Sequence, residues 1–199
     1  MNTTTETQTR WDLATATKYA EHIKRELTGL CEKIDIAGSI RRGRPDCGDI
    51  DLVALVKPGM RDMLEKRVRA SANTRVIKNG PQIMCFILWN GMQVDLFFAL
   101  PESVDMFSTT PGNYGMRLLA MTGSKEHNIL LAKRAKGMGI HFHPYKGLMR
   151  GGKYVTVKGA DDVQEHEEYI GGEVFCGETE EAIFAALGLA FVPPEKREI

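Results

Sequence analysis

The sequence predicts an α+β fold, in which a domain built on a mixed sheet is followed by a small C-terminal α/β subdomain. Apolar residues recur at helical spacing near the start of the chain, and three short apolar segments are then separated by Asn-Gly turn signals. The character changes near residue 120, where glycine-rich and basic segments begin. We therefore expect a polar tail over residues 1–11, one domain over 12–120 and a second over 121–199.

The first domain is expected to begin with an amphipathic helix, because Leu13, Ala16 and Ala20 start a run of apolar residues at three- and four-residue spacing. Alternating or apolar segments bounded by turn residues predict the strands, which form an antiparallel meander joined to an earlier buried strand. The expected helices cover residues 12–30 and 60–71, and the expected strands cover residues 33–37, 49–56, 74–78, 83–89 and 92–99.

The elements that follow are shorter. A helix is expected over residues 111–121, starting at Pro111, and Ser124 is a candidate cap for a helix ending near Arg134. Residues 145–158 are rich in glycine and β-forming residues, which predicts a small hairpin turning at Gly151-Gly152. A last helix is expected over residues 178–187, and Pro193-Pro194 should end regular structure.

Charge is distributed unevenly although the net charge is zero. Residues 121–158 contain eight Lys and Arg against one acidic residue, whereas residues 159–199 contain two against eleven. Either the basic segment meets an anionic partner or the two segments pair with each other.

Composition excludes several classes of protein. The four cysteines are scattered without a C-x-x-C pair, which argues against a zinc ribbon and a disulfide framework. No apolar run reaches the length of a membrane span, and the N-terminus lacks the pattern of a signal peptide. We expect a cytoplasmic protein with no membrane partner. His141 and His143 are expected to be structural or solvent-facing, and Trp11 and Trp89 are expected to cap or fill the core.

Three aspartates indicate a metal site. Asp49 and Asp51 are two residues apart in a predicted strand, so their side chains project from one face. Asp95 lies in the apolar segment VDLFFAL, where an unpaired carboxylate would be costly to bury. If the two strands are neighbours, three carboxylates converge, a ligand set that suits Mg²⁺ and supports two ions in a phosphoryl transfer.

A glycine- and arginine-containing turn precedes the aspartates. Ser39 offers a hydroxyl, and Arg42 offers a planar group of charged donors. Gly38 and Gly48 allow backbone amides to approach an anion closely. This segment predicts a triphosphate-binding site beside the metal ions.

The order of these residues resembles the active-site signature of the DNA polymerase beta-type nucleotidyltransferase fold, and specifically of family X DNA polymerases. The signature reads GSIRRG, five residues, then DID, followed by a lone aspartate in a later strand. The segment MTGSKEHNILLAKRAKGMGIHFHPYKGL resembles the nucleotide-binding segment of that family, and ETEEAIFAALGLAFVPPEKRE resembles its C-terminal end. The resemblance covers nearly the whole chain from about residue 12.

The resemblance implies a nucleotidyltransferase palm over residues 12–120 and a nucleotide- and DNA-binding subdomain over 121–199. It implies two Mg²⁺ ions, which Mn²⁺ could replace, and an acceptor for the proton of the primer 3′-hydroxyl at Asp95. The implied metal ligands are Asp49, Asp51 and Asp95; the implied nucleotide contacts are Gly38, Ser39, Arg42 and Gly48 for the triphosphate and Gly123, Ser124 and Asn128 for the sugar and base, with Arg10 as a further phosphate contact.

The resemblance also implies the function of a minimal DNA polymerase that adds dNMP to a primer 3′-hydroxyl. We expect gap filling in DNA repair or replication, with a dNTP and primer–template or gapped DNA as partners and a monomeric protein. One alternative is a template-independent nucleotidyltransferase acting on RNA ends, a small molecule or a protein. A non-catalytic binding or assembly subunit is a further alternative.

The chain departs from the family in two respects. Ala120-Met121 stands where family members commonly carry an aromatic pair beside the sugar, which predicts weak discrimination against ribonucleotides. We expect only a polar tail before residue 12, where the family usually carries an N-terminal lyase-like domain. We therefore expect weak, salt-sensitive and distributive binding to DNA.

Overall fold

A five-stranded sheet forms the first lobe, with the strand order β2-β4-β7-β6-β5. The computed structural model describes residues 9–71, 74–106, 108–158 and 165–198. β4 and β7 are parallel, whereas the other neighbouring strands are antiparallel, so the predicted mixed sheet is confirmed. The strands are β2 (Cys31–Ile36), β4 (Asp49–Val56), β5 (Arg75–Asn79), β6 (Ile83–Ile87) and β7 (Gln93–Phe98).

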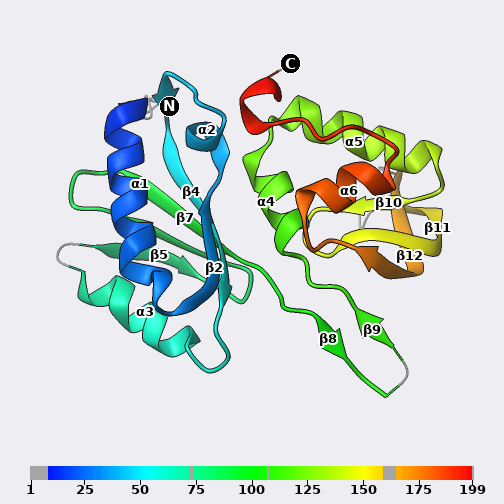
Figure 1. Cartoon of the computed structure of the whole chain (residues 1–199), viewed down its shortest axis with the longest axis horizontal. Helices are drawn as coiled ribbons and strands as arrows, with labels where there is room; N and C mark the ends of the chain where they lie inside the picture. Colours follow the sequence, from blue (N-terminus) through cyan, green and yellow to red (C-terminus); the bar gives the residue numbers. More distant parts are fainter. Residues whose placement is uncertain (1–8, 72–73, 107, 159–164, 199) are drawn as a thin grey trace.

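Two helices cover one face of this sheet (Figure 1). α1 (Leu13–Thr28) is capped by Asp12, whose carboxylate accepts a hydrogen bond from the Thr15 amide, and α3 (Arg61–Ala70) lies beside it. Their apolar sides bury the main core against alternate residues of β4 and β7. Because strand side chains alternate, Asp49 and Asp51 necessarily project from the opposite face.

That opposite face is partly covered by α4 (Tyr114–Thr122). Tyr114 and Leu118 pack with Val53 of the sheet, while Met116 and Leu119 belong to the core of the second lobe. The helix α4 therefore joins the two lobes. The domain boundary near residue 120 stays a prediction.

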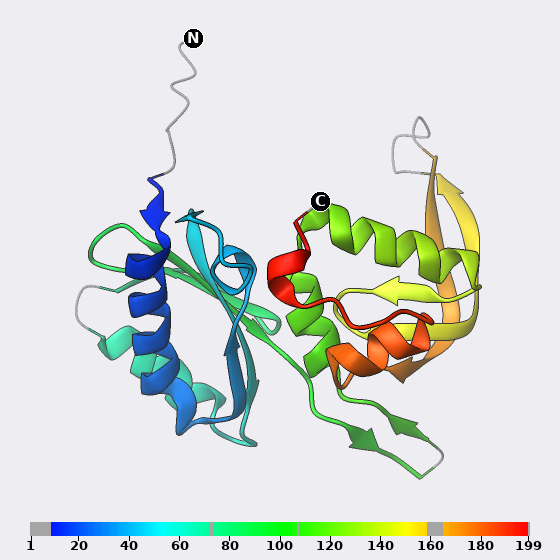
Figure 2. The ribbon, with the colours of Figure 1, turned by 45° about the horizontal axis from the view of Figure 1, so that its top comes forward.

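The second lobe packs two helices against a three-stranded antiparallel sheet (Figure 2). α5 begins after the predicted cap Ser124, which accepts a hydrogen bond from the His127 amide. The elements are α5 (Lys125–Gly137), β10 (His141–His143), β11 (Gly147–Lys158), β12 (Glu165–Cys176), α6 (Glu180–Ala186) and the 3-10 helix η1 (Pro194–Lys196).

Four short strands complete the fold. β1 (Trp11–Asp12) pairs with β3 (Asp46–Cys47), so Trp11 belongs to a strand rather than to the predicted tail, of which residues 1–8 lie outside the described part. β8 (Ser103–Val104) and β9 (Thr109–Thr110) form an arm that projects from the body (Figure 1).

The predicted hairpin at Gly151-Gly152 is wrong. Both glycines lie inside β11, which pairs with β12 from Leu148↔Cys176 to Lys158↔Glu165. Gly151 has a φ of 78° and forms an irregular position within the strand instead of a turn. The acidic segment therefore supplies a strand that the sequence pattern did not indicate.

The observed ends of other elements differ from the predicted ones by a few residues. α4 begins at Tyr114 rather than at Pro111, and α5 continues through Gly137. The turn at 38–43 contains a short helix, α2 (Gly38–Arg41), and a 3-10 helix begins at Pro194, where regular structure was expected to end. Trp89 is 67% exposed and does not fill the core, which corrects its expected role.

The basic and acidic segments pair with each other in part. Lys136 forms an ion pair with Glu167, and Arg150 lies 3.2 Å from Glu173. His141 bonds the Tyr154 hydroxyl at 3.1 Å and stacks on Tyr169, which confirms its structural role. Among the described residues, no helix has the length and apolar character needed to cross a membrane.

Candidate active site

Three carboxylates converge near the start of β4, on the sheet face opposite α1 and α3. Asp49 and Asp51 lie on β4, and the parallel pairing of β4 with β7 sets Asp51 directly beside Asp95. One carboxylate oxygen from each of the three lies within 4.8 Å of the others. The two strands are thus neighbours, as the convergence of the three carboxylates requires. The cluster has the hard oxygen ligands that Mg²⁺ prefers.

The electrostatics of the cluster favour a bound cation. Burial, reinforced by the charges of Asp49 and Asp95, raises the pKa of Asp51 to about 8. Burial and the charge of Asp95 also raise the pKa of Asp49. Because carboxylates held this close repel one another, a divalent cation between them would restore their charged forms.

Neighbouring side chains hold Asp95. The Gln93 amide nitrogen donates to Asp95 Oδ1 at 2.9 Å from the same face of β7. Cys85 lies opposite Asp95 in the β6–β7 register, and burial, together with a hydrogen bond to Asp95, raises the pKa of its thiol to about 11. Asp95 is therefore fixed by a neutral amide and a protonated thiol.

Gly38 is required by the position of Asp51. A Cβ atom at residue 38 would lie 1.9 Å from Asp51 Oδ2, and its φ of 59° is a conformation that side chains disfavour. The Ala37 amide donates to the Asp51 carbonyl at 2.8 Å, which holds α2 against β4. The helix α2 is thus packed directly on the carboxylate cluster.

A cavity of about 630 Å³ opens beside the carboxylates, between α2, β4, α4 and α5. It contains most of the residues predicted to bind the nucleotide, and it also contains Ala120 and Met121, the pair that departs from the family pattern. The predicted residues that line it are Gly38, Ser39, Arg42, Asp49, Asp51, Gly123 and Asn128.

Two polar groups in this cavity lack their full set of partners. The Ser39 hydroxyl is buried and has no hydrogen-bond partner among the described residues. Asn128 donates from its side-chain nitrogen to the Ala120 carbonyl at 2.8 Å, while its buried Oδ1 is unpaired among the same residues. Unpaired buried polar atoms are costly, so their place in the cavity wall fits a polar ligand.

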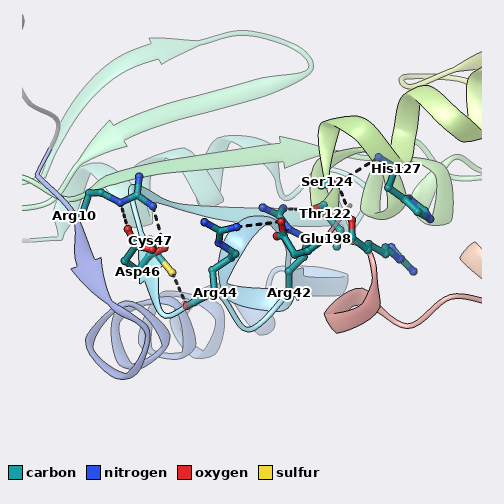
Figure 3. Close-up of polar contacts among 10 residues, drawn as sticks. Arg10, Arg42, Arg44, Asp46, Cys47, Thr122, Ser124, His127 and Glu198 are labelled. Atoms are coloured by element: carbon teal, nitrogen blue, oxygen red, sulfur yellow. Dashed lines mark hydrogen bonds and ion pairs between the residues drawn. The ribbon is translucent and has the colours of Figure 1, made fainter.

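Arg42 points toward the second lobe (Figure 3). Its guanidinium donates to the Thr122 carbonyl and lies 2.5 Å from a carboxylate oxygen of Glu198. Only 16% of its side chain is exposed. The predicted phosphate ligand is therefore in the cavity wall, and a carboxylate of the chain itself contacts it.

Three predicted contacts are not in the cavity wall. Ser124 instead caps α5 and donates from its hydroxyl to the Arg197 carbonyl at 2.7 Å. Gly48 directly precedes Asp49 but is not among the lining residues. Arg10, expected as a phosphate contact, forms an ion pair with Asp46 (Figure 3).

Sequence reasoning missed a buried ionic network beside the cavity. Arg41 contacts both carboxylate oxygens of Glu180, at 2.9 and 2.6 Å, and Arg197 contacts Glu180 Oε1 at 2.7 Å. Arg197 is fully buried. The Arg41-Arg42 pair was a signal for this network, because Arg42 was assigned to the triphosphate and Arg41 was left without an expected partner.

Comparisons with known proteins agree with this architecture. A family model described as DNA polymerase beta thumb matches residues 117–198. The DNA polymerase/3′-5′ exonuclease PolX of Bacillus subtilis (strain 168) is 28% identical over 198 residues, which are 95% of this chain and 29% of that protein. The chain thus spans less than a third of the length of this curated relative.

A solved structure is similar in fold. Leishmania infantum polymerase beta, in a ternary P/T complex, aligns with 96% of this chain and 77% of its own, with a TM-score of 0.67 and 17% sequence identity. At that identity the likeness concerns the fold.

The chain thus combines a fold similar to that of polymerase beta with a cluster of acidic residues suited to metal ions. Residues 117–198, which include the second lobe, match the polymerase beta thumb model, and nearly the whole chain is similar in sequence to part of the Bacillus subtilis PolX.

Proposed function

We propose that this protein is a DNA polymerase that transfers dNMP from a dNTP to the 3′-hydroxyl of a primer and releases pyrophosphate. The observation that carries the proposal is the carboxylate cluster, of which Asp49 and Asp51 line a cavity of about 630 Å³ together with Arg42, Ser39 and Asn128. The 28% identity to a bacterial DNA polymerase supports DNA as the acceptor. Gap filling in repair or replication is the proposed use.

The proposed ligands of two Mg²⁺ ions are Asp49, Asp51 and Asp95. When bound, the ions supply positive charge that favours the ionised 3′-oxygen and offsets charge on the phosphates. Burial, together with the charges of Asp49 and Asp95, raises the pKa of Asp51 to about 8 in the metal-free protein, which fits a site built for cations.

The side chains of the protein perform the remaining tasks. Arg42 and the Ser39 hydroxyl would hold the triphosphate, and Asn128 would contact the base or sugar from α5. Asp95, held by Gln93, would accept the proton of the primer 3′-hydroxyl while the oxygen of that hydroxyl forms a bond to the α-phosphorus of the dNTP. The bond from the α-phosphorus to the bridging oxygen breaks, and pyrophosphate leaves.

The acceptor can be tested with a labelled primer in three settings: at a one-nucleotide gap, on an open template, and without a template. Each reaction would contain Mg²⁺ or Mn²⁺ and the four dNTPs, with the Asp49→Asn/Asp51→Asn double variant as control. Templated addition that the double variant lacks is the expected result. Untemplated addition would instead indicate a terminal transferase, and no addition would contradict the proposal.

A specific observation favours testing ribonucleotides as well. Ala120 and Met121 both line the cavity, so little side-chain bulk stands where an aromatic pair would contact the sugar. We propose weak sugar discrimination, and the ratio of CTP to dCTP incorporation opposite a template guanine measures it. A strong preference for dCTP would contradict this part of the proposal, and efficient extension of RNA ends would favour the alternative acceptor.

A further inference from the structure

One carboxylate near the end of the chain lies between two arginines that precede the aspartate cluster. Arg42 Nε lies 2.5 Å from Glu198 Oε1, and Arg44 Nη1 lies 3.1 Å from Glu198 Oε2 (Figure 3). Each arginine thus contacts a different oxygen of the same group. The hydrogen bond from Arg42 lowers the pKa of Glu198, so its carboxylate is charged at neutral pH.

The position of this ion pair relates it to the cavity. Arg42 lines the cavity together with Ser39, and the Arg44 amide donates to the Ser39 carbonyl at 3.0 Å. Arginine binds carboxylates and phosphates with the same planar set of donors. A phosphate oxygen that reached Arg42 would therefore compete with Glu198 for the same guanidinium.

We propose that Glu198 occupies a phosphate position of the nucleotide site, that a triphosphate displaces it, and that Arg44 is a second phosphate-binding arginine. The inference rests on the proposed function, because it assigns a triphosphate to that cavity. It adds an autoinhibitory contact and a binding residue, Arg44, to the same site.

The local structure allows Glu198 to leave without unfolding the segment that carries it. Its neighbour Arg197 is fully buried and is held by Glu180 Oε1 at 2.7 Å and by the Val192 carbonyl at 2.8 Å. Ser124 also holds the Arg197 carbonyl. The Glu198 side chain itself is 36% exposed, so a rotation of this side chain into solvent suffices.

The strength of the contact sets the expected effect. Partly exposed ion pairs are weak, so losing both contacts of Glu198 changes the affinity of a competing anion by about tenfold. Because both arginines remain in place when Glu198 is neutralised, the affinity should rise.

The test measures binding of inorganic tripolyphosphate to the full chain by calorimetry, in the presence of Mg²⁺ and without DNA. Glu198→Gln should bind about tenfold more tightly than the wild type. Glu195→Gln is the matched control, because Glu195 is exposed in the same segment; it should bind as the wild type does. Adding Arg44→Gln to the Glu198→Gln variant should weaken binding several-fold.

Each outcome decides a separate point. Equal affinities of Glu198→Gln and the wild type would overturn the autoinhibitory contact while leaving the proposed nucleotide site intact. No effect of Arg44→Gln in the Glu198→Gln background would overturn the role of Arg44. No binding by any variant would overturn this inference and the nucleotide site together. Tighter binding by Glu198→Gln in a protein that extends no primer would support the inference and contradict only the choice of acceptor.

Discussion

Gly38 links the glycine-arginine turn to the metal cluster at the level of single atoms. Replacing it with alanine would set a Cβ atom 1.9 Å from Asp51 Oδ2 at a residue with a φ of 59°. We expect Gly38→Ala to move the carboxylate, to lower primer extension by at least about 100-fold and to destabilise the protein by more than about 2 kcal/mol.

Gly43→Ala is the matched control, because Gly43 has a φ of 72° but a Cβ atom added there would meet no atom within 4 Å beyond its chain neighbours. It should incur only the backbone cost of about 1 kcal/mol and retain activity. Denaturant unfolding and extension assays on both variants measure the difference. Equal losses of activity would contradict the role of the Asp51 contact.

Asp51 should make stability depend on pH when no metal is bound. Its folded pKa of about 8 exceeds the ordinary value of 3.8, so the folded state holds a proton that the unfolded state loses between these values. Stability therefore falls as pH rises through this window. Asp51→Asn removes the penalty, and we expect its Tm in EDTA to exceed that of the wild type by about 5 °C at pH 8.5.

The difference should shrink as pH falls toward 3.8, below which Asp51 is protonated in both the folded and the unfolded state of the wild type. At pH 8.5, Mg²⁺ should raise the Tm of the wild type and leave that of Asp51→Asn nearly unchanged. A scan of Tm against pH, with and without Mg²⁺, checks both statements. A wild type more stable than the variant in EDTA at high pH would contradict them.

At the scale of elements, α4 must approach the start of α6 closely. A Cβ atom at Gly115 would lie 2.3 Å from the Thr179 backbone, where the Gly115 amide also bonds the Glu178 carbonyl at 3.0 Å. Gly115→Ala should therefore separate the two helices and destabilise the protein by about 2–4 kcal/mol.

Gly137→Ala provides the comparison within another helix. Gly137 is exposed at the end of α5, and a Cβ atom added there would meet nothing within 4 Å beyond its own helix. Higher helix propensity should make this variant neutral or more stable by up to about 1 kcal/mol. Urea midpoints of the two variants measure the contrast, and a neutral Gly115→Ala would show that α4 and α6 are not closely packed.

The elements also show what a local pattern can predict. The strand at 49–56 was predicted with its observed bounds, because its alternation and its aspartates are local features. The β11–β12 hairpin was not, because Gly151-Gly152 resembles a turn, whereas pairing of Leu148 with Cys176 depends on residues far along the chain. The sequence predicted that Asp95 lies beside Asp51 only if their two strands are neighbours in the sheet, and the strand order itself could not be predicted.

For the candidate site too, local sequence patterns predicted the residues but not their long-range contacts. Residue types and spacing indicated Asp49, Asp51 and the Ser39–Arg42 segment, and the cavity contains them. Ser124 was predicted to contact the nucleotide, yet its hydroxyl is used by α5 and by the Arg197 carbonyl. The partners of Arg42 and Arg44 could not be predicted, because Glu198 reaches them only through the path of the folded C-terminal segment.

At the scale of the whole molecule, Glu180 connects the two lobes. It accepts hydrogen bonds from Arg41 of the first lobe and from the buried Arg197 of the C-terminal segment. Burial opposes its charge, but these bonds hold its pKa below the ordinary value. Glu180→Gln should leave Arg197 without a charged partner and destabilise the protein by about 3–5 kcal/mol at pH 7.

The stabilisation by Glu180 is present above the ordinary glutamate pKa and is lost as pH falls through its lower folded value. The gap in Tm between Glu180→Gln and the wild type should therefore narrow in acid. Glu181→Gln, exposed on the same helix, should be nearly neutral. Calorimetric scans of both variants from neutral to acid pH test this, and a constant gap would contradict the role of the Glu180 charge.

The central claim is that the carboxylate cluster performs nucleotidyl transfer, and a single-turnover assay on gapped DNA with Asp95→Asn tests it most directly. Asp95 is not among the residues lining the cavity, so this variant should still bind a dNTP with near wild-type affinity. We predict that it fails to extend the primer and to release pyrophosphate, with a rate at least about 1,000-fold lower. Extension by Asp95→Asn at the wild-type rate would contradict the assignment of the cluster to catalysis.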